Sequence, residues 1–340
     1  MVKRWGMTVP LGGIPLAEHA DVFKTLVDAG FTDAWTSEVA GTDAFTPLAL
    51  AAAWAPALRL GTAIAPVFTR GPGLLAMTAA ALAETAPGRF QLGVGASSPV
   101  VVGDWNSVPF DRPFARSRDT LRFLRPALAG EMVDQEFETF AVRRFRLERP
   151  PATPPPVLLA ALRPGMLRLA ATEANGVIMN WLAATDVPTA LAETKSAATD
   201  VPAALAEPEN AAAGFDVVAR IFVCPTTDTG YARAVGRRMI TSYLNVPAYA
   251  EFQKWLGRGP ALAGMWSAWA AGDRRGALAA IPDEVVDDLI VHGSPAECRA
   301  KIQAYADNGI RVPVQALIAT PEWDAGSTAD KLALITALGA

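Results

Sequence analysis

Short apolar runs alternate with amphipathic helical runs along almost the whole chain, and this alternation restricts the possible folds more than any other feature. Each step between the first four apolar runs takes about 25–35 residues, the length of a strand–helix–strand unit. Repeated units of this kind form parallel strands covered by helices. Eight strands are expected, centred near residues 5, 34, 62, 92, 158, 178, 220 and 315. This number predicts a TIM (β/α)8 barrel, and therefore one α/β domain over residues 1–340.

Two stretches interrupt the alternation, and we expect both to be insertions into the barrel. At about 135–150, apolar and polar residues alternate, which is typical of a β-hairpin. At about 246–289 the pattern is helical throughout. A further helix followed by a loop is expected between residues 183 and 214, where large apolar side chains are scarce.

The composition limits the chemistry that the side chains can perform. The chain has 30 basic and 34 acidic residues, a net charge of −4 and no basic block, which argues against nucleic acid or an anionic membrane as a partner. Cys224 and Cys298 are too few for a disulfide framework, and with His19 and His292 they provide no metal site. Both histidines are expected to be structural, so no Ser–His–Asp triad is predicted. With no signal peptide or membrane span predicted, we expect a cytoplasmic protein.

Residues after the first strands of the predicted barrel are the first candidates for a site, because TIM barrels place function at the carboxyl ends of their strands. Glu38 follows the second strand and fits a general acid or a partner of a bound ring, although a solvated loop carboxylate fits equally well. Asp43 and Asp104 are weaker candidates for the same role. Arg70 follows the third strand and fits either an anionic ligand or the open surface. Residues 93–99 then form a turn of small residues that lets a ligand approach the backbone.

The fifth and sixth strands end in further candidate positions. Residues 160–165 contain an arginine and lead into a helix whose N-terminus suits an anion, although Pro164 fits plain capping as well. After the sixth strand, Asn180 and Trp181 lie at the rim, where the tryptophan either packs or contacts a ligand. None of these positions combines a nucleophile with its base, so an enzyme built on them would take its difficult chemistry from a cofactor.

Several of these segments resemble a known family. Leu60–Pro66 and Ala81–Ser97 resemble the bacterial luciferase-like superfamily. The segments that resemble its coenzyme F420-dependent oxidoreductases of actinobacteria are Gly95–Pro99, Trp105–Arg116, Asn180–Leu182 and Tyr243–Tyr249. The resemblance implies a homodimeric TIM barrel with insertions that transfers a hydride between coenzyme F420 and a small organic substrate. An FMN-dependent luciferase-like monooxygenase, and a barrel that binds a flavin-type ligand without turnover, are the alternatives.

The resemblance also implies roles for individual residues. Glu38 is the implied catalytic residue, and Trp35 and Trp105 are the implied lining of the substrate pocket. Some relatives carry a histidine directly after this acidic residue, whereas Val39 stands here, which counts against an alcohol dehydrogenase. Members often have a non-prolyl cis peptide in strand 3, and the matching bond is Ala63–Ile64. The implied cofactor-binding residues are Ala63, Ile64, Gly95, Ala96, Ser97, Ser98, Ala160, Ala161, Leu162, Arg163, Gly176, Asn180 and Trp181.

Overall fold

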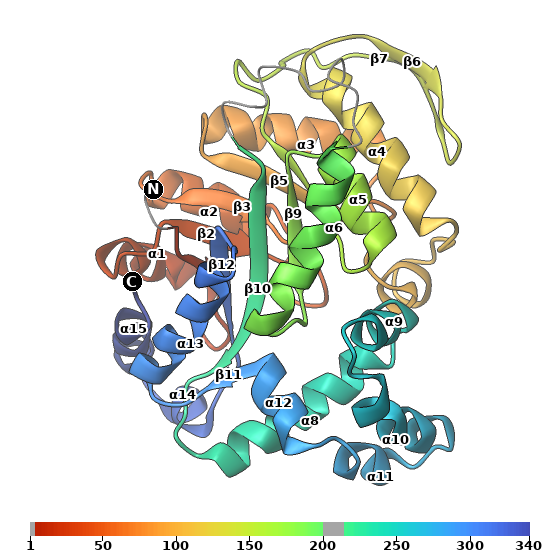
Figure 1. Cartoon of the computed structure of the whole chain (residues 1–340). Coiled ribbons are helices and arrows are strands. Elements are labelled where there is room, and N and C mark those ends of the chain that lie inside the picture. The colour runs from red at the N-terminus through yellow and green to blue at the C-terminus, as the bar shows by residue number, and fades with distance from the viewer. Residues whose placement is uncertain (1–3, 200–213) are drawn as a thin grey trace.

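Eight parallel strands close into a barrel in the computed structural model of the chain, which describes residues 4–199 and 214–340 (Figure 1). Closure follows from the pairing of β10 with β9 on one side and with β12 on the other, because β12 pairs in turn with β1. The predicted TIM barrel is confirmed, with a strand at each of the expected positions. These strands are β1 (Gly6–Thr8), β2 (Asp33–Thr36), β3 (Arg59–Thr62), β5 (Phe90–Gly95), β8 (Val157–Ala160), β9 (Gly176–Asn180), β10 (Asp216–Cys224) and β12 (Val312–Leu317).

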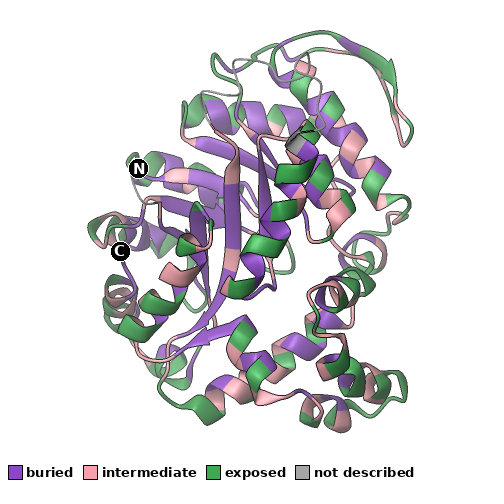
Figure 2. Cartoon of the chain, viewed as in Figure 1, coloured by how far each residue is buried: buried purple, intermediate pink, exposed green. Residues whose placement is uncertain are grey.

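Helices follow the strands and pack on the outer surface of the barrel, so that Figure 2 shows buried strands inside helices with exposed outer faces. Several of them begin with proline, whose fixed φ suits the first helical turn. The outer helices are α1 (His19–Asp28), α2 (Thr46–Trp54), α3 (Pro72–Thr85), α4 (Pro113–Leu128), α5 (Pro164–Glu173), α6 (Val187–Thr199), α8 (Thr229–Leu244), α13 (Pro295–Asp307), α14 (Pro321–Ala325) and α15 (Thr328–Ala337). Shorter elements are β4 (Ala65–Pro66), η1 (Leu16–Glu18), η2 (Val100–Asp104) and η3 (Ala184–Asp186).

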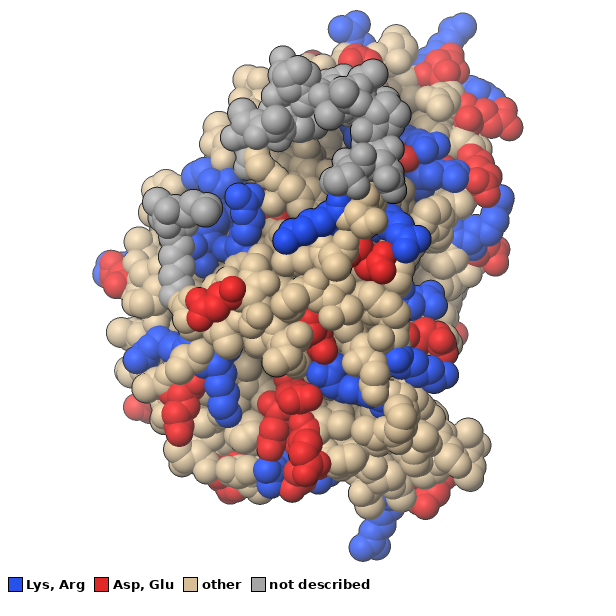
Figure 3. All heavy atoms as spheres, in the orientation of Figure 1, with Lys and Arg blue, Asp and Glu red and all other residues tan. Residues whose placement is uncertain are grey.

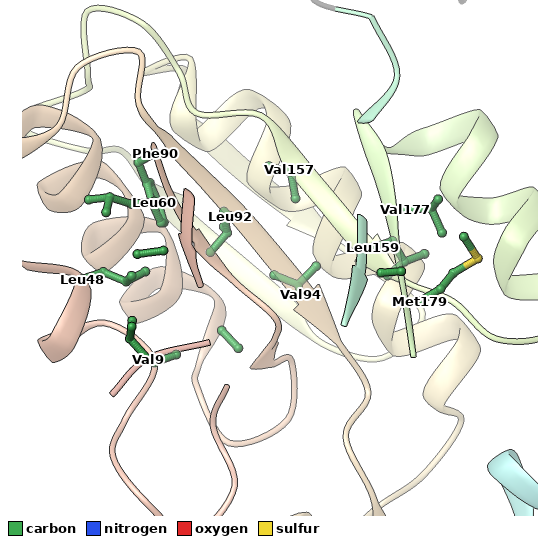
Figure 4. Packing of buried hydrophobic residues seen from close by; sticks show 14 of the residues in the cluster. Val9, Leu48, Leu60, Phe90, Leu92, Val94, Val157, Leu159, Val177 and Met179 are labelled. Atoms are coloured by element: carbon green, nitrogen blue, oxygen red, sulfur yellow. The ribbon is translucent and has the colours of Figure 1, made fainter. Parts of the chain in front are cut away.

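Successive residues of each strand face the lumen and the helices in turn, because side chains of a strand alternate between its two faces. Val218 of β10 packs in the lumen with Trp35 and Leu158 of other strands. The intervening residues pack against the helices in a second and larger cluster. Figure 4 shows part of that outer cluster, including Leu60, Leu92, Val94, Leu159, Val177 and Met179.

Two glycines allow the middle of the lumen to fill completely. The Trp35 ring covers Gly61 so closely that a Cβ there would lie 2.3 Å from the indole. A Cβ on Gly93 would lie 1.9 Å from the backbone oxygen of Thr62. The barrel therefore has a packed core rather than a pore, as is usual for this fold.

A polar network fills the amino end of the lumen. Arg4 donates hydrogen bonds to Asp33 and, at 2.7 Å, to Asp216. Gln91 Nε2 donates to the same Asp216 carboxylate at 2.5 Å. Burial opposes the charge on Arg4, but the hydrogen bonds and charges of Asp33 and Asp216 outweigh it and raise the Arg4 pKa. The network links β2, β5 and β10 at the amino end of the barrel. In TIM barrels the residues at this end usually serve stability rather than function.

Two insertions enlarge the barrel. β6 (Val133–Glu136) and β7 (Ala141–Phe145) form an antiparallel hairpin at the place where the sequence predicts one. The hairpin packs on the outside of α4, where three of its phenylalanines contact the ring of Phe123. The second insertion comprises α9 (Pro247–Trp255), α10 (Gly259–Ala270), α11 (Arg274–Ala279), α12 (Asp283–Leu289) and β11 (Ile290–His292).

The helical insertion lies beyond the carboxyl ends of the strands. β11 extends the sheet beside the last residues of β10, and Figure 1 shows the helices grouped at the end toward which β10 runs. Of the helix and loop expected at 183–214, the structure has α6, and residues 200–213 lie outside the described part. None of the helices in the described ranges is long and apolar enough to cross a membrane.

Candidate active site

The carboxyl end of the lumen is accessible, in contrast to its middle. One layer below the rim, Trp35, Leu158 and Val218 are completely buried. At the rim itself, five residues from different strands are partly exposed, namely Thr8, Ile64, Ala160, Asn180 and Arg220. Trp35, which the resemblance assigns to the substrate pocket, is thus the floor beneath the rim rather than part of an open wall. Its indole Nε1 has no hydrogen-bond partner within the described ranges.

Glu38 lies at this rim and is held by two donors. The backbone amide of Ala44 and Nη2 of Arg70 each donate a hydrogen bond to Glu38 Oε2 at 2.8 Å. Both side chains of the ion pair are 17% exposed, and Asp43 lies further from Arg70, at 3.7 Å. Arg70 also stacks over Phe45, 4.7 Å from its ring centroid. The sequence places Glu38 and Arg70 at the rim separately, and the structure joins them in one ion pair.

Small and apolar residues form the wall on the β4–β5–β8 side of the rim. A Cβ on Gly95 would lie 2.8 Å from Cβ of Ala160 and 3.1 Å from Ile64, so these three residues are in close contact. β4 pairs with the end of β5 behind this wall. The Ala63–Ile64 peptide bond is cis, as the resemblance implies. Together with Ala63, the wall contains four of the implied cofactor-binding residues, namely Ala63, Ile64, Gly95 and Ala160.

Two residues directly after barrel strands have left-handed backbone conformations. Ser97 follows β5 with φ of 65°, and Trp181 follows β9 with φ of 53°. Such conformations are costly for residues other than glycine and gather at functional sites, where the surrounding structure enforces them. Trp181 is fully buried against Phe222, with ring centroids 4.4 Å apart, and its backbone oxygen accepts a hydrogen bond from Gln253 of the insertion. The side chain of Trp181 therefore packs against the cluster beneath the insertion, and its contact with a ligand stays a prediction.

The N-terminus of α5 follows β8 at the same rim. Arg163 is the N-cap residue and is exposed, and its side chain makes no capping hydrogen bond. The first backbone amides of a helix have no partner within the helix, and its dipole favours an anion there. Leu162 is half-buried beside it. The helix start therefore has backbone amides without helical partners next to an arginine, and the anion site at residues 160–165 stays a prediction.

The wall opposite contains residues that sequence reasoning missed. Arg220 lies in the lumen next to Asn180, its register partner on β9. Tyr243 at the end of α8 and Tyr249 of α9, the first helix of the insertion, approach these two residues. One sequence signal could have found Arg220, because it is the single charged residue in the apolar run from 217 to 224.

Other predicted residues have different surroundings from those at the rim. Gly176 begins β9 at the amino end, roughly 13 Å from Asn180 at about 3.3 Å per residue. Ala161 is buried against the helices, and Trp105 is 54% exposed after the π-helical turn η2. Asp104 is exposed on that turn. The expectation that Gly176 lies at the rim is therefore wrong. A Cβ at this position would meet the Asp216 backbone, so close packing at the amino end explains the glycine.

Both histidines have structural partners. His19 is buried, and its Nε2 accepts a hydrogen bond from the Leu11 amide at 2.9 Å. His292 pairs with Asp287 at 3.0 Å. The two cysteines are buried, and burial raises the thiol pKa of Cys224 to about 11 and of Cys298 to about 12, so neither supplies a thiolate nucleophile at neutral pH.

A large cavity of about 1050 Å³ lies at the opposite, amino end of the barrel. Its lining includes Arg4, Arg59, Arg125 and Arg311. On the face of the molecule in Figure 3, acidic and basic side chains lie interspersed rather than gathered into one extended basic surface. The cavity has both polar and apolar lining and borders the network around Arg4, whereas the candidate site at the other end has a wall of small apolar residues.

The chain is thus a closed parallel barrel with a helical insertion beyond its carboxyl end and a wall of small apolar residues at that rim. The chain belongs to the luciferase-like monooxygenase family, whose model matches residues 3–311.

Three similar proteins extend this assignment. A Mycobacterium tuberculosis protein with the provisional name of a coenzyme F420-dependent oxidoreductase is 27% identical over 326 residues, or 89% of this chain and 91% of the relative. The structure of the coenzyme F420-dependent tetrahydromethanopterin reductase from Methanopyrus kandleri has a TM-score of 0.75 at 19% identity and covers 99% of this chain and 98% of its own. The FMN-bound oxygenating component of a 3,6-diketocamphane monooxygenase from Pseudomonas putida has a TM-score of 0.63 at 14% identity, over 100% of this chain and 97% of its own. At these identities the two structures show a shared fold.

Proposed function

We propose that this protein is an oxidoreductase that transfers a hydride between coenzyme F420 and a small organic substrate at the carboxyl end of its barrel. The observation that carries the proposal is the wall of Ile64, Gly95 and Ala160 at a rim where Glu38 is held by Arg70. Such a wall gives a flat ring a surface but supplies no nucleophile, so the redox chemistry has to come from a cofactor. The provisional F420 assignment of the M. tuberculosis relative supports a deazaflavin.

The residues present fit such a cofactor. Any side chain on Gly95 would push into Ala160, so the wall stays flat only with glycine there. The helix start at Arg163 is suited to the phosphate of the cofactor, through backbone amides and the nearby guanidinium. When bound, F420 supplies the ring carbon that accepts or donates the hydride.

Glu38 is the residue that we propose for proton transfer. Hydride transfer to or from a carbon–oxygen bond requires a matching proton transfer, and a positioned carboxylate can perform it. The hydrogen bonds from Ala44 and Arg70 both use Oε2 and so fix the direction of the carboxylate. We propose that the second oxygen of Glu38, Oε1, accepts the substrate proton at the rim and returns it in the reverse reaction.

An FMN-dependent monooxygenase is the second candidate. The fold similarity to a monooxygenase component that is in complex with FMN supports it. A non-catalytic barrel that binds a flavin-type ligand is the third, and the sparse polar rim suits it.

We also propose that the protein is a homodimer. Leu74 and Met77 of α3 and Phe114 of the neighbouring α4 are 45–51% exposed, which is unusual for large apolar side chains. A self-complementary patch on two helices would bury them. Light scattering after gel filtration is expected to give twice the 35.8 kDa mass of the chain, and a single-chain mass would contradict the proposal.

Titration of the purified protein with F420 and, separately, with FMN tests the proposed function. We expect saturable quenching of F420 fluorescence at micromolar cofactor, and FMN binding that is at least about tenfold weaker. FMN-dependent oxygen uptake without a response to F420 would favour the monooxygenase. Binding of F420 with no spectral change under any substrate panel would favour the non-catalytic barrel, and the absence of binding to either cofactor would overturn the flavin-type assignment.

A further inference from the structure

Arg220 is a charged side chain in an otherwise apolar part of the barrel lumen. On β10 it alternates with Val218, which is buried in the lumen core, and with Phe222, which packs under the helical insertion. Its guanidinium lies over the Phe222 ring, 4.9 Å from the centroid. The residue retains some accessible surface, so it faces the open end of the lumen while most of it is enclosed.

The partners of Arg220 leave its charge uncompensated. Its side chain hydrogen-bonds to Tyr243, and its Nε has no partner. Across residues 4–199 and 214–340, no ion pair involves Arg220. Burial disfavours the charged form and lowers the pKa of Arg220, and within the described part of the chain only Tyr243 and Tyr249 act against this effect. A guanidinium enclosed in this way without a carboxylate is costly for folding, which points to a partner that arrives as a ligand.

Barrel order places Arg220 on the wall opposite the proposed ring surface. Around the closed sheet the sequence of strands is β1, β2, β3, β5, β8, β9, β10 and β12. β10 is four positions from β3, so Arg220 faces the Ala63–Ile64 segment across the rim. A molecule lying on the open face of a ring at that segment would therefore meet the guanidinium, together with the partly exposed Tyr243 and Tyr249.

We propose that Arg220 binds the anionic group of the substrate, which is a small carboxylate whose apolar body lies between the cofactor ring and the side chains of Tyr243 and Tyr249. Guanidinium and carboxylate match in a planar, two-point hydrogen-bonded geometry. The inference rests on the proposed function and narrows its substrate class. An anionic group of the cofactor could also bind Arg220, and the experiment distinguishes this possibility from a substrate carboxylate.

Calorimetric titration with benzoate and with its neutral counterpart benzamide tests the proposal, on the protein with and without F420. The F420 affinity of each variant is measured first by fluorescence. We expect wild type to prefer benzoate over benzamide by about tenfold or more. Arg220→Gln is expected to abolish that preference while changing the F420 affinity less than about twofold, and Arg220→Lys to retain part of it. Arg238→Gln, an exposed arginine on α8, is the matched control and should behave as wild type.

Thermal unfolding distinguishes a ligand-binding arginine from a structural one. Because Arg220→Gln removes an uncompensated charge, we expect its Tm to equal or exceed that of wild type. A Tm lower by more than about 5 °C would assign Arg220 to folding and overturn the proposal. Equal binding of benzoate and benzamide to wild type would also overturn it, as would a tenfold loss of F420 affinity in Arg220→Gln. Failure of wild type to bind F420 is a failure of the proposed function, and the carboxylate preference without cofactor still decides the role of Arg220.

Discussion

Glu38 combines a proposed chemical role with a structural one at the scale of the single residue. Its carboxylate is the near partner of Arg70, whereas Asp43 is more distant and 41% exposed. Glu38→Gln leaves a half-buried arginine poorly paired, so we expect the free energy of unfolding to fall by about 1–3 kcal/mol. Asp43→Asn, the matched control, should change it by less than about 1 kcal/mol. Urea denaturation of both variants measures this, and equal losses would contradict the assignment of Glu38 as the main partner.

His19 provides a prediction in pH. Burial lowers its pKa, against the smaller effect of its hydrogen bond to Pro15. As the pH falls, the unfolded chain therefore takes up the proton first, near pH 6.5, and stability falls with it until the folded pKa is reached. We expect the free energy of unfolding of wild type to decrease between pH 7.5 and 6, and to decrease less in His19→Gln, whose side-chain oxygen can still accept from Leu11. Identical pH dependence of the two proteins would show that His19 does not titrate in this way.

Residues at the rim differ in how far the sequence predicts them. Glu38 and Asn180 are identifiable because each follows an apolar run at the place where a strand must end. Arg220 lies inside such a run, and alternation alone does not say that its face of the strand opens to the rim. Tyr249 reaches the site only because the insertion packs against the end of the barrel, and Tyr243 because α8 ends there, and no local pattern encodes either placement.

The strands of the barrel depend on close approach at the scale of the element, and Gly93 shows this most clearly. A side chain there would meet the Thr62 backbone oxygen and the side chain of Ile178, and backbone cannot yield cheaply. We expect Gly93→Ala to lower the free energy of unfolding by about 1–3 kcal/mol or more. Gly12→Ala is the control, because a Cβ there would meet nothing within 4 Å. Thermal unfolding of both variants is the measurement, and a Gly93→Ala protein as stable as the control would contradict this packing.

Long periodic elements are well predicted from sequence, and short ones are not. The barrel strands and outer helices follow from spacing, since one face of each is buried. β11 has three residues and exists because it pairs with β10, and the π-helical η2 follows from no pattern in residues 100–104. These elements are set by tertiary contacts that spacing does not report.

At the scale of the whole molecule, the two ends of the barrel have different roles. The amino end holds the ionic network of Arg4, Asp33 and Asp216, which links distant segments of the chain. The carboxyl end is covered by the helical insertion and contains the small-residue wall, Glu38 and Arg220. Closure of the barrel is predictable from the number of strands, whereas the presence of a large cavity at the amino end is not, because it depends on how loops pack beneath the strands.

The central claim is that F420 binds at the carboxyl end, and fluorescence titration of two matched variants tests it most directly. Ala160→Phe places a ring in the rim, and Ala306→Phe places one in the amino-end cavity. Thermal unfolding first establishes that both variants are folded. We then predict that Ala160→Phe weakens F420 binding by about tenfold or more, while Ala306→Phe binds F420 as wild type does. Loss of binding in Ala306→Phe with unchanged binding in Ala160→Phe would contradict the claim and place the cofactor at the other end.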